Sequence, residues 1–148
     1  MEYIEKFTCI RFKDVSHVEE YPGKLEIVLT EEKKCSSKIG FKKESEMILH
    51  KRYCFRKHGI ILHELLHALG TPHEHQRYDR INYLVIEWGN IRPSRFYEFY
   101  KIREELSAII TAGLPYDFTS IMHYSLYALA KDKNYKTLIP KMNLSEEI

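Results

Sequence analysis

Residues 63–80 carry the side chains with the clearest chemical potential in this sequence and read HELLHALGTPHEHQRYDR. His63 and His67 are four residues apart, so on an α-helix their imidazoles share one face and can reach the same ion. His73 follows a break in the pattern and can supply a third nitrogen. Three protein ligands leave a coordination position for water, whose pKa zinc lowers, and Glu64 is placed to take its proton. The spacing predicts one zinc ion per chain and hydrolytic chemistry.

A lone histidine on an apolar helix is more often a hydrogen-bonded core residue than a metal ligand. Here the pattern also requires Gly70 and His73 at fixed distances from His63, and these constraints together favour the metal site. The other histidines are predicted to be surface or hydrogen-bonding residues, and His123 to shape its own turn without touching zinc. The four in the first group are His17, His50, His58 and His75.

The helix that must carry this pattern runs from about Ile60 to Leu69. It is apolar nearly all round, so we expect it to be buried. Gly70 suits the left-handed position that ends a helix, and Pro72 prevents the helix from continuing. The break is needed, because a straight helix would carry His73 away from the metal.

Weaker patterns surround this helix. We expect the tail of a helix at the start, four strands before the zinc helix and a second helix after it. A Gly-Leu-Pro breaker then precedes the segment YDFTSIMHY. The predicted ranges are 1–7 (helix), 8–15, 25–30 and 46–55 (strands), 36–41 (a weak strand or an extended loop) and 95–110 (helix).

The whole-chain composition is that of an ordinary globular domain. The chain has 148 residues, 44% of them hydrophobic and 30% charged, with a formal net charge of +2. Its basic clusters are scattered among glutamates, which predicts no nucleic-acid partner. No apolar run is long enough to span a membrane, and no signal peptide is recognisable at the start.

The three cysteines leave the compartment open. Cys35 and Cys54 bracket a stretch that could form a hairpin, and Cys9 is left over. An odd count implies either one free thiol or a partner outside this chain. Three reduced, buried thiols in a cytosolic protein are equally compatible with the composition.

Taken together, these motifs resemble one family. The pattern H-E-x-x-H-x-x-G-x-x-H-E over His63–Glu74, followed by R-x-D-R at 77–80, resembles the astacin branch of the metzincin metalloproteases. The segment 120–124 (SIMHY) is similar to that family's Met-turn with its tyrosine. Shorter matches at 8–12, 82–83, 90–91 and 116–117 extend the resemblance over nearly the whole chain.

The resemblance implies a role for each matching residue. His63, His67 and His73 would ligate zinc, and Glu64 would act as general base. Further implied residues are Met122, the hydrophobic floor beneath the metal, and Tyr124, a displaceable ligand that stabilises the oxyanion.

The implied fold is α+β and zincin-like: a single domain over 1–148 with two lobes. The N-terminal lobe, about 1–70, would hold a twisted mixed sheet and the active-site helix. The C-terminal lobe, about 71–148, would be irregular. A strand at the edge of the cleft would pair with an extended peptide or protein substrate. Its residues are Glu46, Met47, Ile48, Leu49, His50, Lys51, Arg52 and Tyr53.

The resemblance further implies a disulfide between Cys35 and Cys54, worth on the order of 3 kcal/mol. A disulfide favours a secreted, extracellular protein over a cytosolic one. The triplet Asn143-Leu144-Ser145 fits the N-glycosylation pattern, which matters only in a secreted chain.

The sequence also departs from the family pattern. The family's catalytic domain is longer than this sequence at both ends. The family's final cysteine, which has no counterpart here, is the one that would pair with Cys9. Glu74 normally receives a buried N-terminal ammonium, so here we expect a carboxylate left without its partner, which is costly. Two functions follow: a zinc-dependent endopeptidase, or a catalytically incompetent remnant that binds zinc or peptide without turnover.

Overall fold

The computed structural model describes residues 1–141, apart from the side chain of Glu44. The predicted glycosylation triplet at Asn143 lies outside the described residues. The chain divides into two compact units, Met1–Thr71 and Pro72–Ile148. We call them the N-terminal unit and the C-terminal unit and describe each by itself.

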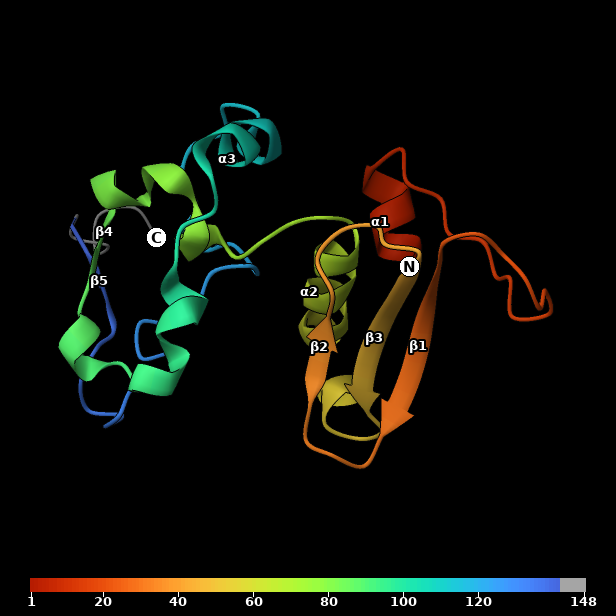
Figure 1. Ribbon diagram of the computed structural model, residues 1–148, viewed down its shortest axis with the longest axis horizontal. Helices are drawn as coiled ribbons and strands as arrows, with labels where there is room; N and C mark the ends of the chain where they lie inside the picture. The colour runs from red at the N-terminus through yellow and green to blue at the C-terminus, as the bar shows by residue number, and fades with distance from the viewer. Residues whose placement is uncertain (142–148) are drawn as a thin grey trace. The chain divides into compact units, whose positions relative to one another are not determined.

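The N-terminal unit is built on a three-stranded mixed sheet (Figure 1). After helix α1 (Glu2–Phe7) come strands β1 (Lys24–Thr30), β2 (Cys35–Ser37) and β3 (Glu44–His50). β3 is central: it pairs in parallel with β1 along its whole length and antiparallel with β2 at Met47–Leu49. Figure 1 shows helix α2 (His58–Ala68) beside β2 and β3.

The core of this unit forms where alternate β3 side chains meet the two helices. Met47 and Leu49 are almost completely buried, as are Ile4 of α1 and Leu65 of α2. Each such aliphatic side chain contributes on the order of 2 kcal/mol when it leaves water. The core therefore holds the metal-binding helix against the sheet.

The predicted strand at 8–15 is wrong: this segment follows α1 without forming a strand. Its polar groups are taken up locally instead. The Thr8 hydroxyl donates to the Ile4 carbonyl at 2.8 Å, and the Arg11 guanidinium donates to three nearby carbonyls. The Glu5 carboxylate accepts the Phe12 amide at 2.7 Å. Because these bonds satisfy the backbone, alternation of side chains alone does not produce a ladder here.

The predicted substrate-binding strand is also wrong. A strand over 46–53 at the edge of the cleft needs one unpaired side for an extended peptide, but β3 ends at His50 and is paired on both sides in the centre of the sheet. Beyond it the chain turns, because the His50 Nδ1 accepts the amides of Arg52 and Tyr53. The strand expected at 36–41 is short, and it is β2 that occupies the sheet edge next to α2.

The C-terminal unit contains little regular structure. Over residues 72–141, its elements are a two-stranded antiparallel sheet of β4 (Leu84–Ile86) with β5 (Leu138–Pro140), helix α3 (Glu104–Thr111) and four 3₁₀ segments. The 3₁₀ segments span Glu74–Gln76, Tyr78–Asn82, Trp88–Asn90 and Pro93–Phe99. A second core gathers around Phe99 and Ile91, both fully buried, with Leu84, Tyr116 and Leu138.

The single helix predicted over 95–110 is broken in two. The chain leaves the first piece at Tyr100, whose backbone is extended (φ −71°, ψ 141°), and resumes helical geometry only after Arg103. The apolar spacing was therefore shared by two short elements. Among residues 1–141, no helix is long and apolar enough to cross a membrane.

Candidate metal centre

The zinc helix ends as its sequence predicts. Gly70 takes a positive φ of 104°, which a glycine adopts without strain. The Gly70 amide donates to the His67 carbonyl at 2.8 Å, and the Thr71 amide donates to the Leu66 carbonyl at 2.9 Å. This pair of bonds is a Schellman motif, so α2 ends at Ala68, one residue after His67, and the chain changes direction.

His67 is held in one orientation by the backbone around it. Its Nδ1 lies 2.7 Å from the Thr71 carbonyl oxygen, and because a carbonyl only accepts, Nδ1 carries the proton. The Nε2 atom is then the one with a lone pair for a metal ion. Burial lowers the pKa of His67, with the Thr71 hydrogen bond opposing, and the neutral ring is the form that binds metal. The His67 carbonyl also accepts the Gly40 amide at 2.9 Å, which ties α2 to the segment after β2.

His73 is positioned by the 3₁₀ turn that follows it. Its amide donates to the Gln76 side-chain oxygen at 3.3 Å, and its carbonyl accepts the Gln76 amide at 3.0 Å. The Gln76 side-chain nitrogen in turn donates to the Glu98 carbonyl at 3.2 Å. The third histidine therefore stands on a short, cross-linked turn.

The three predicted ligands converge. One ligand nitrogen from each of His63, His67 and His73 lies within 4.8 Å of the others, and the rings are buried or half-buried. Three imidazoles at this spacing are a donor set that suits zinc and leaves a position open for water. The prediction of one metal ion per chain is confirmed to this extent: three histidines are positioned to bind it.

Glu64 lies buried in the helix turn that carries His63 and His67, with 6% of its surface exposed. Burial raises its pKa to about 7, and a backbone hydrogen bond from Ser37 of β2 opposes that rise. Its Oε2 atom has no hydrogen-bond partner among the described residues. A buried carboxylate oxygen without a partner is costly, and a nearby cation or water would satisfy it, so Glu64 also fits a metal centre.

The two Met-turn residues lie in the C-terminal unit with His73. Met122 is buried, and its carbonyl accepts the Glu74 amide at 3.0 Å, which joins the turn to the end of the zinc motif. The Tyr124 ring lies against His73 with 4.4 Å between ring centroids and stacks on His75 at 4.1 Å. Burial, followed by the nearby Glu98 charge, raises the pKa of Tyr124. The tyrosine is therefore a phenol beside one metal ligand.

Two further histidines support this region. His75, predicted as a surface or hydrogen-bonding residue, is fully buried, and its Nε2 bonds to the Glu98 carbonyl at 3.0 Å. Burial lowers its pKa to about 3, so the ring is neutral. His123 bonds to the Tyr124 carbonyl through Nδ1 at 2.6 Å and to the Tyr116 hydroxyl through Nε2 at 2.7 Å. These contacts agree with the role predicted for His123 in its own turn.

The expectation that Glu74 lacks a partner is wrong. Its Oε1 atom accepts from Arg77 Nη1 at 2.8 Å and from the Asp117 amide at 3.0 Å. Arg77 is itself almost completely buried. The motif thus contains its own counter-ion three residues along the chain, and the carboxylate is paired within the C-terminal unit.

The cysteines are placed as the resemblance implied. Cys35 and Cys54 form a disulfide between β2 and the short 3₁₀ turn Cys54–Arg56. Cys9 is free and exposed in the described structure. The bond links the edge strand to the segment that leads directly into α2.

Sequence reasoning missed one contributor to the site and misjudged the extent of another. The predicted weak strand or extended loop at 36–41 did not show that β2 covers only Cys35–Ser37 or that the backbone of Ser37 bonds to Glu64. Glu98, which contacts the turn carrying His73, gave no signal, because an isolated glutamate between aromatic residues has no distinctive spacing.

An apolar helix bearing His-Glu-x-x-His, a third histidine after a glycine break and a buried methionine turn together define a metzincin-type zinc metallopeptidase fold. Comparison with known proteins gives the family. All 148 residues match the model of Astacin, a family of peptidases. The chain belongs to the astacin family.

Several relatives support this membership. Low choriolytic enzyme from Oryzias latipes is 36% identical over 96% of this chain and 48% of its own length. Astacin-like metalloendopeptidase from Mus musculus is 35% identical over 97% of this chain and 31% of its own length. A solved structure is also similar, that of High choriolytic enzyme 1, a hatching enzyme zinc-protease from Oryzias latipes. The two structures superpose with a TM-score of 0.83 and 33% sequence identity, over 97% of this chain and 66% of that chain.

The chain therefore spans half or less of the length of these curated relatives and about two thirds of the solved structure. The metal-binding motif, the disulfide and the Met-turn all lie within the shared part.

Proposed function

We propose that this chain is a zinc-dependent endopeptidase that hydrolyses peptide bonds in extended polypeptides. The observation that carries the proposal is the convergence of three histidine nitrogens next to a buried carboxylate that has an unpartnered oxygen. When bound, zinc supplies Lewis acidity, which polarises a peptide carbonyl and makes water a better acid.

Glu64 acts as the general base and then the general acid. Its carboxylate takes a proton from water as the water oxygen bonds to the peptide carbon. It then delivers that proton to the nitrogen as the carbon–nitrogen bond breaks. A carboxyl group whose pKa is raised towards 7 is matched to both steps. Tyr124 donates its hydroxyl hydrogen to the oxygen on which negative charge develops.

The substrate pairs with β2. The outer edge of β2 has no strand partner among the described residues, whereas β3 is paired on both sides. An extended peptide added to this edge would run beside the strand whose Ser37 contacts Glu64. The Cys35–Cys54 disulfide supports an extracellular working environment.

The test is hydrolysis of a denatured protein by the zinc-loaded chain, with and without a chelator. Glu64→Gln should lower kcat/KM by roughly 10²–10⁴-fold while zinc content stays the same. Glu32→Gln, an exposed residue in the N-terminal unit, is the matched control and should keep full activity. A folded, zinc-loaded wild-type chain that shows no turnover would instead establish the incompetent remnant.

A further inference from the structure

Glu98 lies beside the tyrosine of the Met-turn. Its Oε2 atom is 3.5 Å from the Tyr124 hydroxyl oxygen, at the outer limit of a hydrogen bond. No other acceptor for this hydroxyl is found within residues 72–141. The Tyr124 ring also lies against His73, so the carboxylate is one side chain away from a metal ligand.

The Glu98 backbone fixes where its side chain can reach. Its carbonyl accepts hydrogen bonds from His75 at 3.0 Å and from Gln76 at 3.2 Å. The next residue, Phe99, is fully buried in the core of the C-terminal unit. The Glu98 backbone is thus fixed in two ways. Its carbonyl is bonded to the segment that follows His73, and the next residue is held in the core.

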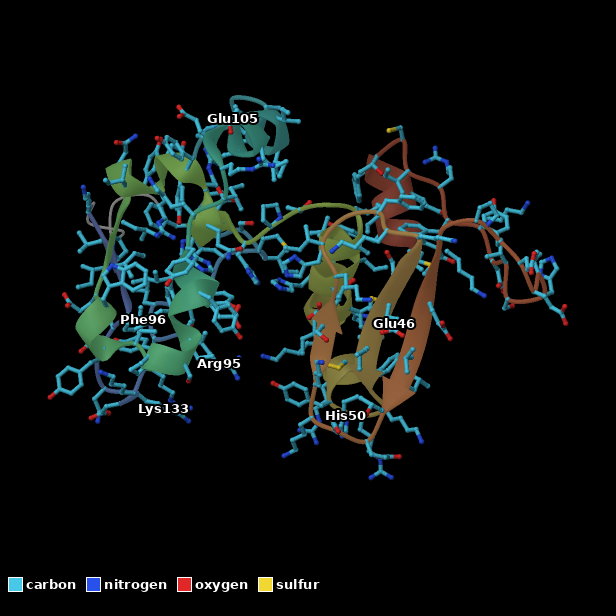
Figure 2. The ribbon with its side chains drawn as sticks, viewed as in Figure 1. Glu46, His50, Arg95, Phe96, Glu105 and Lys133 are labelled. Atoms are coloured by element: carbon cyan, nitrogen blue, oxygen red, sulfur yellow. A yellow bond between two sulfur atoms is a disulfide. The ribbon has the colours of Figure 1, made fainter. Side chains whose placement is uncertain are left out.

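The two carboxylate oxygens have different partners. Oε1 lies 3.4 Å from Arg95 Nη1, and Oε2 is the oxygen that faces Tyr124. Figure 2 labels Arg95 and Phe96, which lie on the same 3₁₀ segment as Glu98. The ion pair is partly exposed, with 48% of the Arg95 side chain and 25% of the Glu98 side chain accessible. Arg95 therefore orients the carboxylate without removing the oxygen that faces Tyr124.

A phenol has a single O–H hydrogen, which can be donated to only one acceptor at a time. We propose that Glu98 is a positioning residue for Tyr124: its carboxylate accepts the hydroxyl hydrogen and holds the phenol in one rotamer, so that the oxygen is not at the metal and the hydrogen is not available to the oxyanion. This inference rests on the proposed function, in which Tyr124 is a displaceable metal ligand and an oxyanion donor. It gives the tyrosine a defined resting partner within the C-terminal unit.

The test uses the full chain with Cu(II) in place of zinc, because a phenolate oxygen bound to Cu(II), its proton released to solvent, produces a charge-transfer band in visible light. Glu98→Gln removes the negative charge, and Glu98→Leu removes the acceptor as well. Loss of one hydrogen bond should lower the ratio of Tyr124 hydroxyl bonded to residue 98 to hydroxyl not bonded there by roughly fivefold. We therefore expect a stronger band in Glu98→Gln and at least as strong a band in Glu98→Leu.

Two controls make the result specific. Glu105→Gln changes charge equally on an exposed residue of the same unit, labelled in Figure 2, and should leave the band unchanged. Tyr124→Phe should abolish the band. Copper bound with the same or a weaker band in both Glu98 variants would overturn this inference and leave the proposed peptidase intact. A chain that binds no copper would overturn both.

Discussion

The two units position their functional residues by different physical means. In the N-terminal unit, an aliphatic core and regular hydrogen-bond ladders hold His63, Glu64 and His67 on one helix. In the C-terminal unit, His73 and Tyr124 sit on irregular backbone that side chains cross-link. One regular helix positions several functional residues at once. In irregular backbone, each functional residue needs its own side-chain hydrogen bonds to hold it in place.

The two units also differ in the polar groups that they bury. The C-terminal unit buries two arginines, Arg77 and Arg80, whose guanidinium groups donate mainly to backbone carbonyls and neighbouring carboxylates. Such donors replace the hydrogen bonds that a helix or strand would have supplied. We therefore expect the N-terminal unit to be most sensitive to lost apolar volume and covalent links, and the C-terminal unit to lost polar partners.

The largest expected effect is that of Arg77→Leu. The Arg77 guanidinium bonds to the carboxylates of Glu74 and Asp79 and to the carbonyls of Leu114 and Pro115. Removing it leaves several partly buried acceptors without this donor, which should lower the free energy of unfolding by about 3 kcal/mol or more. Hydrogen exchange should locate the loss in residues 72–141.

Arg92→Leu is the matched control, because Arg92 is an exposed arginine of the same unit. It should change stability by less than about 0.5 kcal/mol. Equal effects of the two substitutions would show that buried arginines do not organise the C-terminal unit.

The next effect concerns the covalent link in the N-terminal unit. Replacing both Cys35 and Cys54 by alanine opens a loop whose ends are 19 residues apart in sequence. The chain-entropy model gives a loss of about 3 kcal/mol. Denaturation monitored by hydrogen exchange should place this loss in residues 24–58 rather than in the C-terminal unit.

Cys9→Ser serves as the control, since Cys9 is free and exposed. It should leave stability within about 0.5 kcal/mol of the wild-type value. If the double alanine variant matched Cys9→Ser, the disulfide would contribute nothing to the N-terminal unit.

The same difference explains what the sequence could predict. The zinc helix, its stop at Gly70 and the strand that became β1 followed from apolar periodicity and a glycine, because burial on one element imposes a period. The three-histidine cluster followed from helical spacing plus that stop. The strand order did not follow, since pairing between β3 and its neighbours depends on contacts distant in sequence. That is why the strand predicted to pair with substrate turned out to be central and paired on both sides.

The C-terminal unit was less predictable for a related reason. Its 3₁₀ segments are too short to show a period, and the bonds that hold them run from side chains to carbonyls. A carbonyl is present at every residue, so the acceptor in such a bond leaves no trace in the sequence. Arg77 was visible in the sequence only as part of the R-x-D-R pattern, and its bonds, like those of Glu98, could be recognised only once the backbone was placed.

The smallest expected effect tests one of these bonds at the Met-turn. His123 Nδ1 donates to the Tyr124 carbonyl, so Nε2 accepts from the Tyr116 hydroxyl at 2.7 Å. Tyr116→Phe leaves that nitrogen without a donor and should cost about 1–2 kcal/mol, whereas Tyr135→Phe, at an exposed residue, should cost almost nothing. The decisive measurement is a double-mutant cycle: in a His123→Phe background, Tyr116→Phe should lose most of its effect, because the acceptor is already gone. Full additivity would mean that the tyrosine stabilises the turn through its ring alone, and the C-terminal unit would then resemble the N-terminal unit more than its polar contacts suggest.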